Sequence, residues 1–162
     1  MFKIRLLILL LTSALLFSCT KNSNINHSTK FSIAYISGEY DGLLLKNLLT
    51  SYLNALDLYD QASSYEIRSS IKHTSDLYIT NIDNTSDRTS IDTNASFQII
   101  NSNKNCSVFS YDDNVSQFYI ITSSDKFLSN QKAVKKIKKD NTEALVKSFI
   151  NKLSRLDLGC HE

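Results

Sequence analysis

The sequence contains no proline, and only three of its 162 residues are glycine. Three glycines cannot build a glycine-rich phosphate loop, and turns must rely on Asn, Asp and Ser instead. No His-Glu-x-x-His, Cys-x-x-Cys or nucleophile-elbow pattern occurs, and the three histidines, His27, His73 and His161, are scattered. The sequence therefore predicts a protein that is not an enzyme and that has no cofactor and no metal.

Long apolar runs are also absent, except at the N-terminus. There Lys3 and Arg5 accompany an apolar core of about 12 residues, which is the layout of a secretory signal peptide over residues 1–18. This core is well short of the roughly 20 residues that span a bilayer as a helix. A transmembrane anchor in this segment is therefore not expected.

The end of this segment, Leu16-Phe17-Ser18-Cys19, resembles a bacterial lipobox. In such a sequence Cys19 is acylated and becomes the first residue of the mature chain, and its acyl chains hold the protein on a membrane. The alternative is an ordinary signal peptide with a chance cysteine. Thr20, in place of an aspartate, favours the outer membrane facing the periplasm, and the polar residues 19–30 are expected to form a flexible tether.

The mature chain has no excess of charge. Removing residues 1–18 leaves 144 residues, and removing Lys3 and Arg5 from the 18 basic residues leaves 16, against 16 acidic residues. A neutral chain gives no support for nucleic-acid binding driven by net charge. Its length corresponds to one domain, which we place at residues 31–158.

The apolar patterns predict an α+β fold in the order strand, helix, three strands, helix. The strands are expected at 31–36, at 65–80 with a bulge around 74–76, at 90–99, and at 106–122 with a kink at 112–114. The helices are expected at 42–57, with Asp41 as N-cap, and at 128–157, ending near Gly159. Both helices would pack on one face of a four-stranded, mostly antiparallel sheet, giving a two-layer sandwich.

Within this fold, the residues that could carry chemistry have simpler structural explanations. His73 lies on the apolar side of a strand, where a single histidine is most often structural. The pair Asp112-Asp113 is expected to form a turn rather than a metal site.

The last helix is strongly basic. Nine basic residues lie between residues 126 and 157, against Asp140, Glu143 and Asp157. Four of them occupy neighbouring helical positions and form a patch: Lys132, Lys135, Lys136 and Lys139. This patch is either a solvated helix face or a surface for an anionic partner, and Arg88 in the preceding hairpin allows the same two interpretations.

Two cysteines remain once Cys19 is assigned to lipid. Cys106 and Cys160 would form a disulfide in an oxidising periplasm or stay as two buried thiols, and both alternatives are open.

Several short stretches follow a familiar order. They are the lipobox, Ile-Ala-Tyr-Ile at 33–36, Leu-Leu-Leu-Lys-Asn-Leu-Leu at 43–49, Tyr-Glu-Ile-Arg at 65–68, Asn-Ala-Ser-Phe-Gln-Ile-Ile at 94–100, and the closing helix. Over about residues 31–156 the chain resembles the lipopolysaccharide-assembly lipoprotein family, LptE, in its short alphaproteobacterial form.

The resemblance implies a non-enzymatic role. A protein of this family sits inside the β-barrel of its outer-membrane partner LptD, helps the barrel to fold, and contacts lipopolysaccharide during delivery to the outer leaflet. Two other classes stay open: a periplasm-facing binding lipoprotein with an unrelated partner, and a small hydrolase that uses His73, Asp112 and Asp113.

Overall fold

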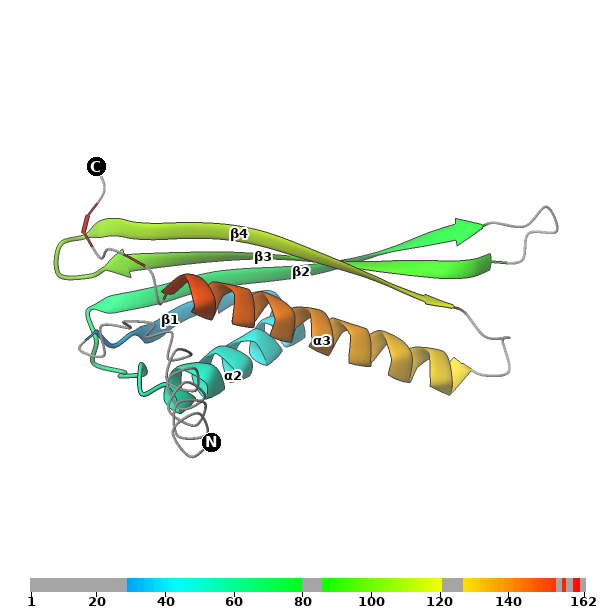
Figure 1. Cartoon of the computed structure of the whole chain (residues 1–162), viewed down its shortest axis with the longest axis horizontal. Helices are drawn as coiled ribbons and strands as arrows, with labels where there is room; N and C mark the ends of the chain where they lie inside the picture. The colour runs from blue at the N-terminus through cyan, green and yellow to red at the C-terminus, as the bar shows by residue number, and fades with distance from the viewer. Residues whose placement is uncertain (1–28, 80–85, 121–126, 154–155, 157–158, 161–162) are drawn as a thin grey trace, which may run out of the picture.

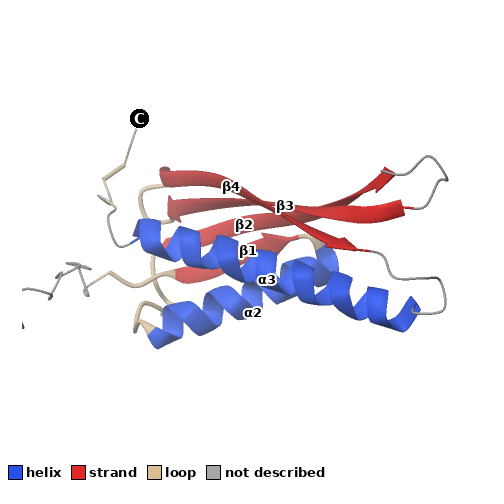
Figure 2. Ribbon diagram, turned by 45° about the vertical axis from the view of Figure 1, so that its right-hand side comes forward, coloured by secondary structure: helices blue, strands red, loops and turns tan. Residues whose placement is uncertain are grey.

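The computed structural model describes residues 29–79, 86–120, 127–153, 156 and 159–160. Its elements are β1 (Ser32–Ser37), α2 (Glu39–Ala55), β2 (Tyr65–Ile79), β3 (Ser86–Asn101), β4 (Cys106–Ile120) and α3 (Phe127–Leu153). The strands form one sheet in the order β1-β2-β3-β4. β1 pairs with β2 in parallel, and the other two pairs are antiparallel. Both helices lie on one face of the sheet, which confirms the predicted α+β sandwich (Figures 1 and 2).

The two faces of the sheet follow the alternation of side chains along β2. Ile67, Ser69 and Ile71 are buried under the helices, whereas Arg68, Ser70 and Lys72 are exposed on the opposite face. Because side chains alternate with period two, one residue of slippage would exchange these faces. The sheet therefore has one apolar face that the helices cover and one polar outer face.

The core lies where both helices cover the sheet. Leu45, Leu49 and Leu53 recur every four residues on α2 and are fully buried. From α3, the ring of Phe149 stacks on Phe97 of β3, with ring centroids 4.3 Å apart and planes inclined by 8°. Truncating one of these buried leucines to alanine should cost about 2–5 kcal/mol of stability.

β2 and β4 are more regular than the sequence predicts, and β3 is longer than the predicted 90–99. The bulge around Thr74–Asp76 is absent, since β2 and β3 pair residue by residue from Tyr65 to Tyr78. The predicted kink and turn at Asp112-Asp113-Asn114 are also wrong. These residues lie inside β4 and pair with Ser96, Ala95 and Asn94 of β3. The hydrogen-bonded neighbouring strand outweighs the turn preference of Asp and Asn.

Helix boundaries differ as well. α2 begins at Glu39, its N-cap is Gly38, and Asp41 therefore lies inside the first turn rather than capping it. α3 runs without interruption past Asp140 and ends at Leu153, six residues before the glycine that was expected to stop it.

β2, β3 and β4 continue well beyond β1. The last residue of β1, Ser37, pairs with Ser70, so the rest of β2 forms a three-stranded ribbon with β3 and β4. Figure 1 shows that α3 continues beneath this ribbon while α2 does not. In the described part of the chain, no helix is long and apolar enough to cross a membrane.

Candidate binding surface at the end of the ribbon

Large apolar side chains are exposed where the ribbon ends. The same end of the molecule holds the C-terminal ends of β2 and β4 and the start of α3 (Figures 1 and 2). The side chains there are 47–71% exposed, and we call this set the distal tip: Leu77, Tyr78, Phe118, Ile120, Phe127 and Leu128. The rings of Tyr78 and Phe118 contact each other, with centroids 5.9 Å apart. Large apolar side chains that are exposed together at one end are typical of an interaction site.

Arg88 lies within this apolar setting. On β3 it is paired directly with Tyr78 of β2 and with Ile120 of β4, and it is exposed. Directly paired residues point to the same face of a sheet, so Arg88 lies on the polar outer face, away from the helices. The structure thus places a cation between two exposed apolar side chains.

The four lysines of the predicted patch lie on the other layer. All four are exposed on the first half of α3, at the same end of the molecule as the distal tip. Lys136 forms an ion pair with Asp140, one turn away. Lys132 and Lys135 have no carboxylate partner among the described residues. The structure therefore brings Arg88 and the lysines to one end of the molecule, but on opposite sides of the ribbon.

Sequence reasoning predicted the cations and missed the distal tip. The signal was present, because consecutive apolar residues at strand ends, such as Leu77-Tyr78 and Phe118-Tyr119-Ile120, place side chains on both faces. A solvated outer face does not need them.

His73 lies near the middle of β2, and its side chain is buried. Its imidazole is 1% exposed, and Nδ1 lies 2.7 Å from Oγ1 of Thr93 on β3. Nε2 faces Oδ1 of Asp41 at 3.8 Å, beyond hydrogen-bond distance. Burial lowers the pKa of His73 below its usual value; Asp41 opposes this shift, and the Lys138 ammonium adds to it.

The hydroxyl beside this imidazole and the two aspartates of β4 lie in different environments. Thr93, the hydroxyl beside the imidazole, is fully buried. Asp113 accepts a hydrogen bond from the Tyr111 hydroxyl at 2.6 Å, and Asp112 lies exposed in the β4 ladder. No group of three potential metal ligands occurs among the described residues.

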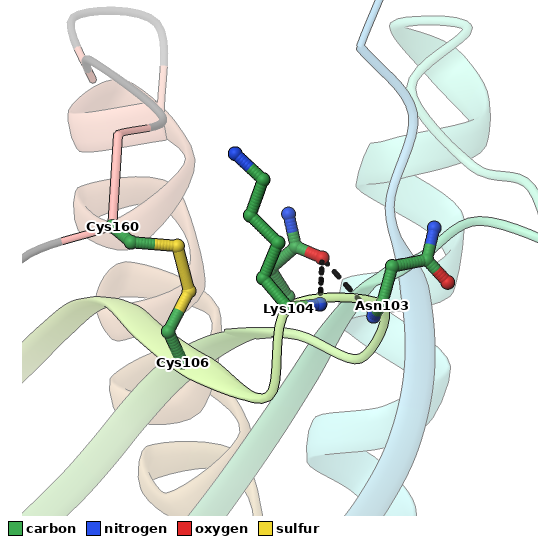
Figure 3. Close-up of a disulfide and its surroundings, with 5 residues drawn as sticks. Asn103, Lys104, Cys106 and Cys160 are labelled. Carbon is green, nitrogen blue, oxygen red and sulfur yellow. Dashed lines mark hydrogen bonds between the residues drawn. A yellow bond between two sulfur atoms is a disulfide. The ribbon is translucent and has the colours of Figure 1, made fainter.

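The two remaining cysteines are joined. Cys106 at the start of β4 and Cys160 near the C-terminus form a disulfide, with Cα atoms 5.9 Å apart. Figure 3 shows the bond beside the turn that carries Asn103 and Lys104. The Asn101 side chain stabilises this turn by accepting from the amides of Asn103 and Lys104. Cys19 lies outside the described residues.

Comparison with known proteins identifies the fold. No protein-family model and no curated protein matches the chain. The crystal structure of a minor lipoprotein from Acinetobacter baumannii is 14% identical, with a TM-score of 0.59 over 82% of this chain and 97% of that chain.

Two further solved structures are similar. That of rare lipoprotein B from Shewanella oneidensis is 13% identical, with a TM-score of 0.56 over 76% of this chain and 96% of that one. The structure of lipoprotein B from Nitrosomonas europaea is 12% identical, with a TM-score of 0.56 over 78% of this chain and 84% of that one. At this level of identity the matches show that the chain has the fold of these lipoproteins.

Proposed function

We propose that this protein is an outer-membrane lipoprotein and a non-enzymatic partner of the β-barrel protein LptD, assisting its assembly and the delivery of lipopolysaccharide to the outer leaflet. One observation carries the proposal: the chain shares its two-layer fold with solved lipoproteins, rare lipoprotein B among them. The predicted acylation of Cys19 and the order of the short similar stretches support the same role.

The arrangement of the two ends suits a tethered partner. β1 begins at the end of the molecule opposite the distal tip (Figure 1). At about 3.3 Å per residue, the 15 residues of β2 alone extend about 50 Å. A lipid on Cys19, followed by a short tether, would leave the distal tip free to reach into a partner.

The chemistry of the distal end suits a phosphorylated amphiphile. Arg88 can form bidentate hydrogen bonds with a phosphate group, and Lys132, Lys135, Lys136 and Lys139 add positive charge on the helix layer. The exposed rings of Tyr78 and Phe118 offer apolar surface for acyl chains. Lipopolysaccharide combines both features.

Reversing the charge of Arg88 tests this assignment. Arg88→Glu should weaken binding of purified lipopolysaccharide by tenfold or more, because a carboxylate repels phosphate where a guanidinium attracted it. Arg68→Glu is the matched control, since Arg68 on β2 is exposed on the same outer face of the sheet as Arg88 but is distant from the tip along the strand. Equal affinity of the wild type and Arg88→Glu for lipopolysaccharide would show that Arg88 is not part of the binding site.

Depletion tests the partner. Loss of this protein should reduce the amount of assembled LptD barrel in the outer membrane, and a tagged copy should recover that barrel from detergent extracts. Recovery of only soluble proteins, with barrel assembly intact, would favour a binding lipoprotein with a different partner.

A further inference from the structure

His73 belongs to a layer of buried polar groups that joins α3 to the sheet. We call His73, Thr93 and Asn141 the central polar layer. The Asn141 amide nitrogen on α3 donates to the carbonyl of Ile91 at 3.2 Å, to Oγ1 of Thr93 at 3.0 Å, and to the carbonyl of Val115 at 3.5 Å. One side chain of α3 is therefore bonded to both β3 and β4.

The two halves of α3, before Asn141 and from Asn141 onward, differ in how deeply they are buried. None of the residues from Phe127 to Asp140 is buried. From Asn141 onward, seven residues are: Asn141, Thr142, Leu145, Val146, Phe149, Ile150 and Leu153. The first half of α3 has little apolar burial to hold it on the ribbon, so the bonds of Asn141 at its inner end carry more of that attachment.

The hydrogen bonds determine where the proton of neutral His73 lies. The buried Thr93 hydroxyl needs an acceptor, and among the described contacts Nδ1 of His73, at 2.7 Å, supplies it. Nδ1 is then the acceptor, and the single ring proton sits on Nε2, which has no hydrogen-bond partner among the described residues. Neutral His73 thus satisfies the Thr93 hydroxyl and leaves the Nε2 proton facing Asp41 at 3.8 Å.

A second proton on the ring disturbs this arrangement. With a proton on Nδ1, the Thr93 hydroxyl loses its acceptor, and the side chain of Asn141 beside it carries an unsatisfied acceptor, Oδ1. For Oδ1 to face the Thr93 hydroxyl, the side-chain amide of Asn141 must flip. The flip breaks the hydrogen bonds from its nitrogen to the carbonyls of Ile91 and Val115. Asp41 attracts the new imidazolium charge, but burial of the ring outweighs that attraction, and the same carboxylate also pairs with Lys138 at 3.2 Å.

We propose that His73 is a pH-sensitive switch: the neutral imidazole fastens α3 to the ribbon through Asn141, and protonation releases the half from Phe127 to Asp140. This inference does not depend on the proposed partner. Two charged groups face the imidazole among the described residues, Asp41 from α2 and Lys138 from α3, while β3 presents the uncharged Thr93.

The direction of the pH dependence follows from burial. The folded protein holds the pKa of His73 below that of an exposed histidine, about 6.5, so the released form binds the extra proton more readily. The fastening is complete above about pH 6.5 and weakens as the pH falls toward the lower pKa of the folded state. Within that window the opening equilibrium should rise by up to about tenfold per pH unit.

Hydrogen exchange on the full mature chain tests the switch. Protection factors, corrected for intrinsic exchange, should fall between pH 7.5 and pH 5.5 for amides of 127–140 and stay constant for 141–153. In His73→Gln, which cannot titrate, the pH dependence of residues 127–140 should disappear. The same dependence in both proteins, or an equal change in both halves of α3, would overturn the proposal.

Asp41→Asn provides a second variant that retains the imidazole. Removing the carboxylate that raises the pKa of His73 should move the imidazole titration, followed by NMR, to lower pH, and the exchange of residues 127–140 should move with it. A titration that moves while the exchange stays in place would refute the coupling, whether or not His73→Gln folds.

Discussion

At the scale of residues, the start of α2 depends on the backbone conformation of its N-cap, Gly38. Gly38 has φ of 121°, a conformation that L side chains rarely adopt. A Cβ atom at this position would lie 2.7 Å from the carbonyl oxygen of Ile71. The glycine is needed both for its backbone angle and for the close approach of the loop to β2.

Gly38→Ala should therefore destabilise the protein. Both the positive φ and the contact with a backbone oxygen act in the same direction, and we expect a loss of about 1–3 kcal/mol. The midpoint of urea unfolding measures it. Ser51→Ala, an exposed position on α2, is the control and should change the midpoint little. An unchanged midpoint for Gly38→Ala would mean that the loop relaxes at no cost.

At the scale of elements, α3 is attached to the sheet very differently along its length. Its second half packs Leu145, Val146 and Phe149 into the core. The Ser148 hydroxyl also lies 2.7 Å from the hydroxyl of Tyr111 on β4. Beyond the helix, Cys160 is bonded to Cys106, which ties the end of the chain to the start of β4. The first half has no comparable burial, so motion in α3 should begin there.

The disulfide should contribute to the stability of this arrangement. It closes a loop with a sequence separation of 54, for which chain entropy gives about 4 kcal/mol, with 2–4 kcal/mol typical of measured values. Dithiothreitol should lower the melting temperature of the wild type accordingly. The double variant Cys106→Ser/Cys160→Ser should melt at the temperature of the reduced protein and should not respond to the reductant. A reductant effect on that variant would point to another cause.

At the scale of the whole molecule, the two ends have different chemistry. The predicted tether, residues 19–30, leads directly into the end of the molecule where β1 begins. There Lys30 forms an ion pair with Asp57, with the charged atoms 2.8 Å apart. The opposite end carries the distal tip, with Ile120 69% and Leu128 71% exposed. If Cys19 is acylated as predicted, an elongated domain with lipid at one end and apolar side chains at the other would suit a link between a membrane and a partner.

Cys19→Ala tests the membrane attachment. Acyl chains contribute about 0.8 kcal/mol per buried methylene, so their loss should release the protein from the membrane fraction into the soluble fraction. Mass spectrometry of the wild-type N-terminus should show the corresponding lipid. Retention of the variant in membranes, together with an unmodified wild-type N-terminus, would rule out lipidation.

The sequence by itself determined the order of the elements and the apolar face of α2 and of β2. The leucines of α2 and the alternation along β2 are local patterns, and burial of one face follows from them directly. The basic half of α3 was equally visible in the sequence. Each of these features depends only on spacing along the chain.

The tertiary structure alone decided what depends on neighbours distant in sequence. Asp112, Asp113 and Asn114 favour a turn, yet they extend β4 because β3 pairs with them. Asp41 looked like a helix cap and instead faces His73, and the outer end of the ribbon collects apolar side chains from three elements. Pairing, burial and the proximity of charges are properties of contacts between segments, so a local pattern can supply at most one strand's share of them, as Leu77-Tyr78 and Phe118-Tyr119-Ile120 do.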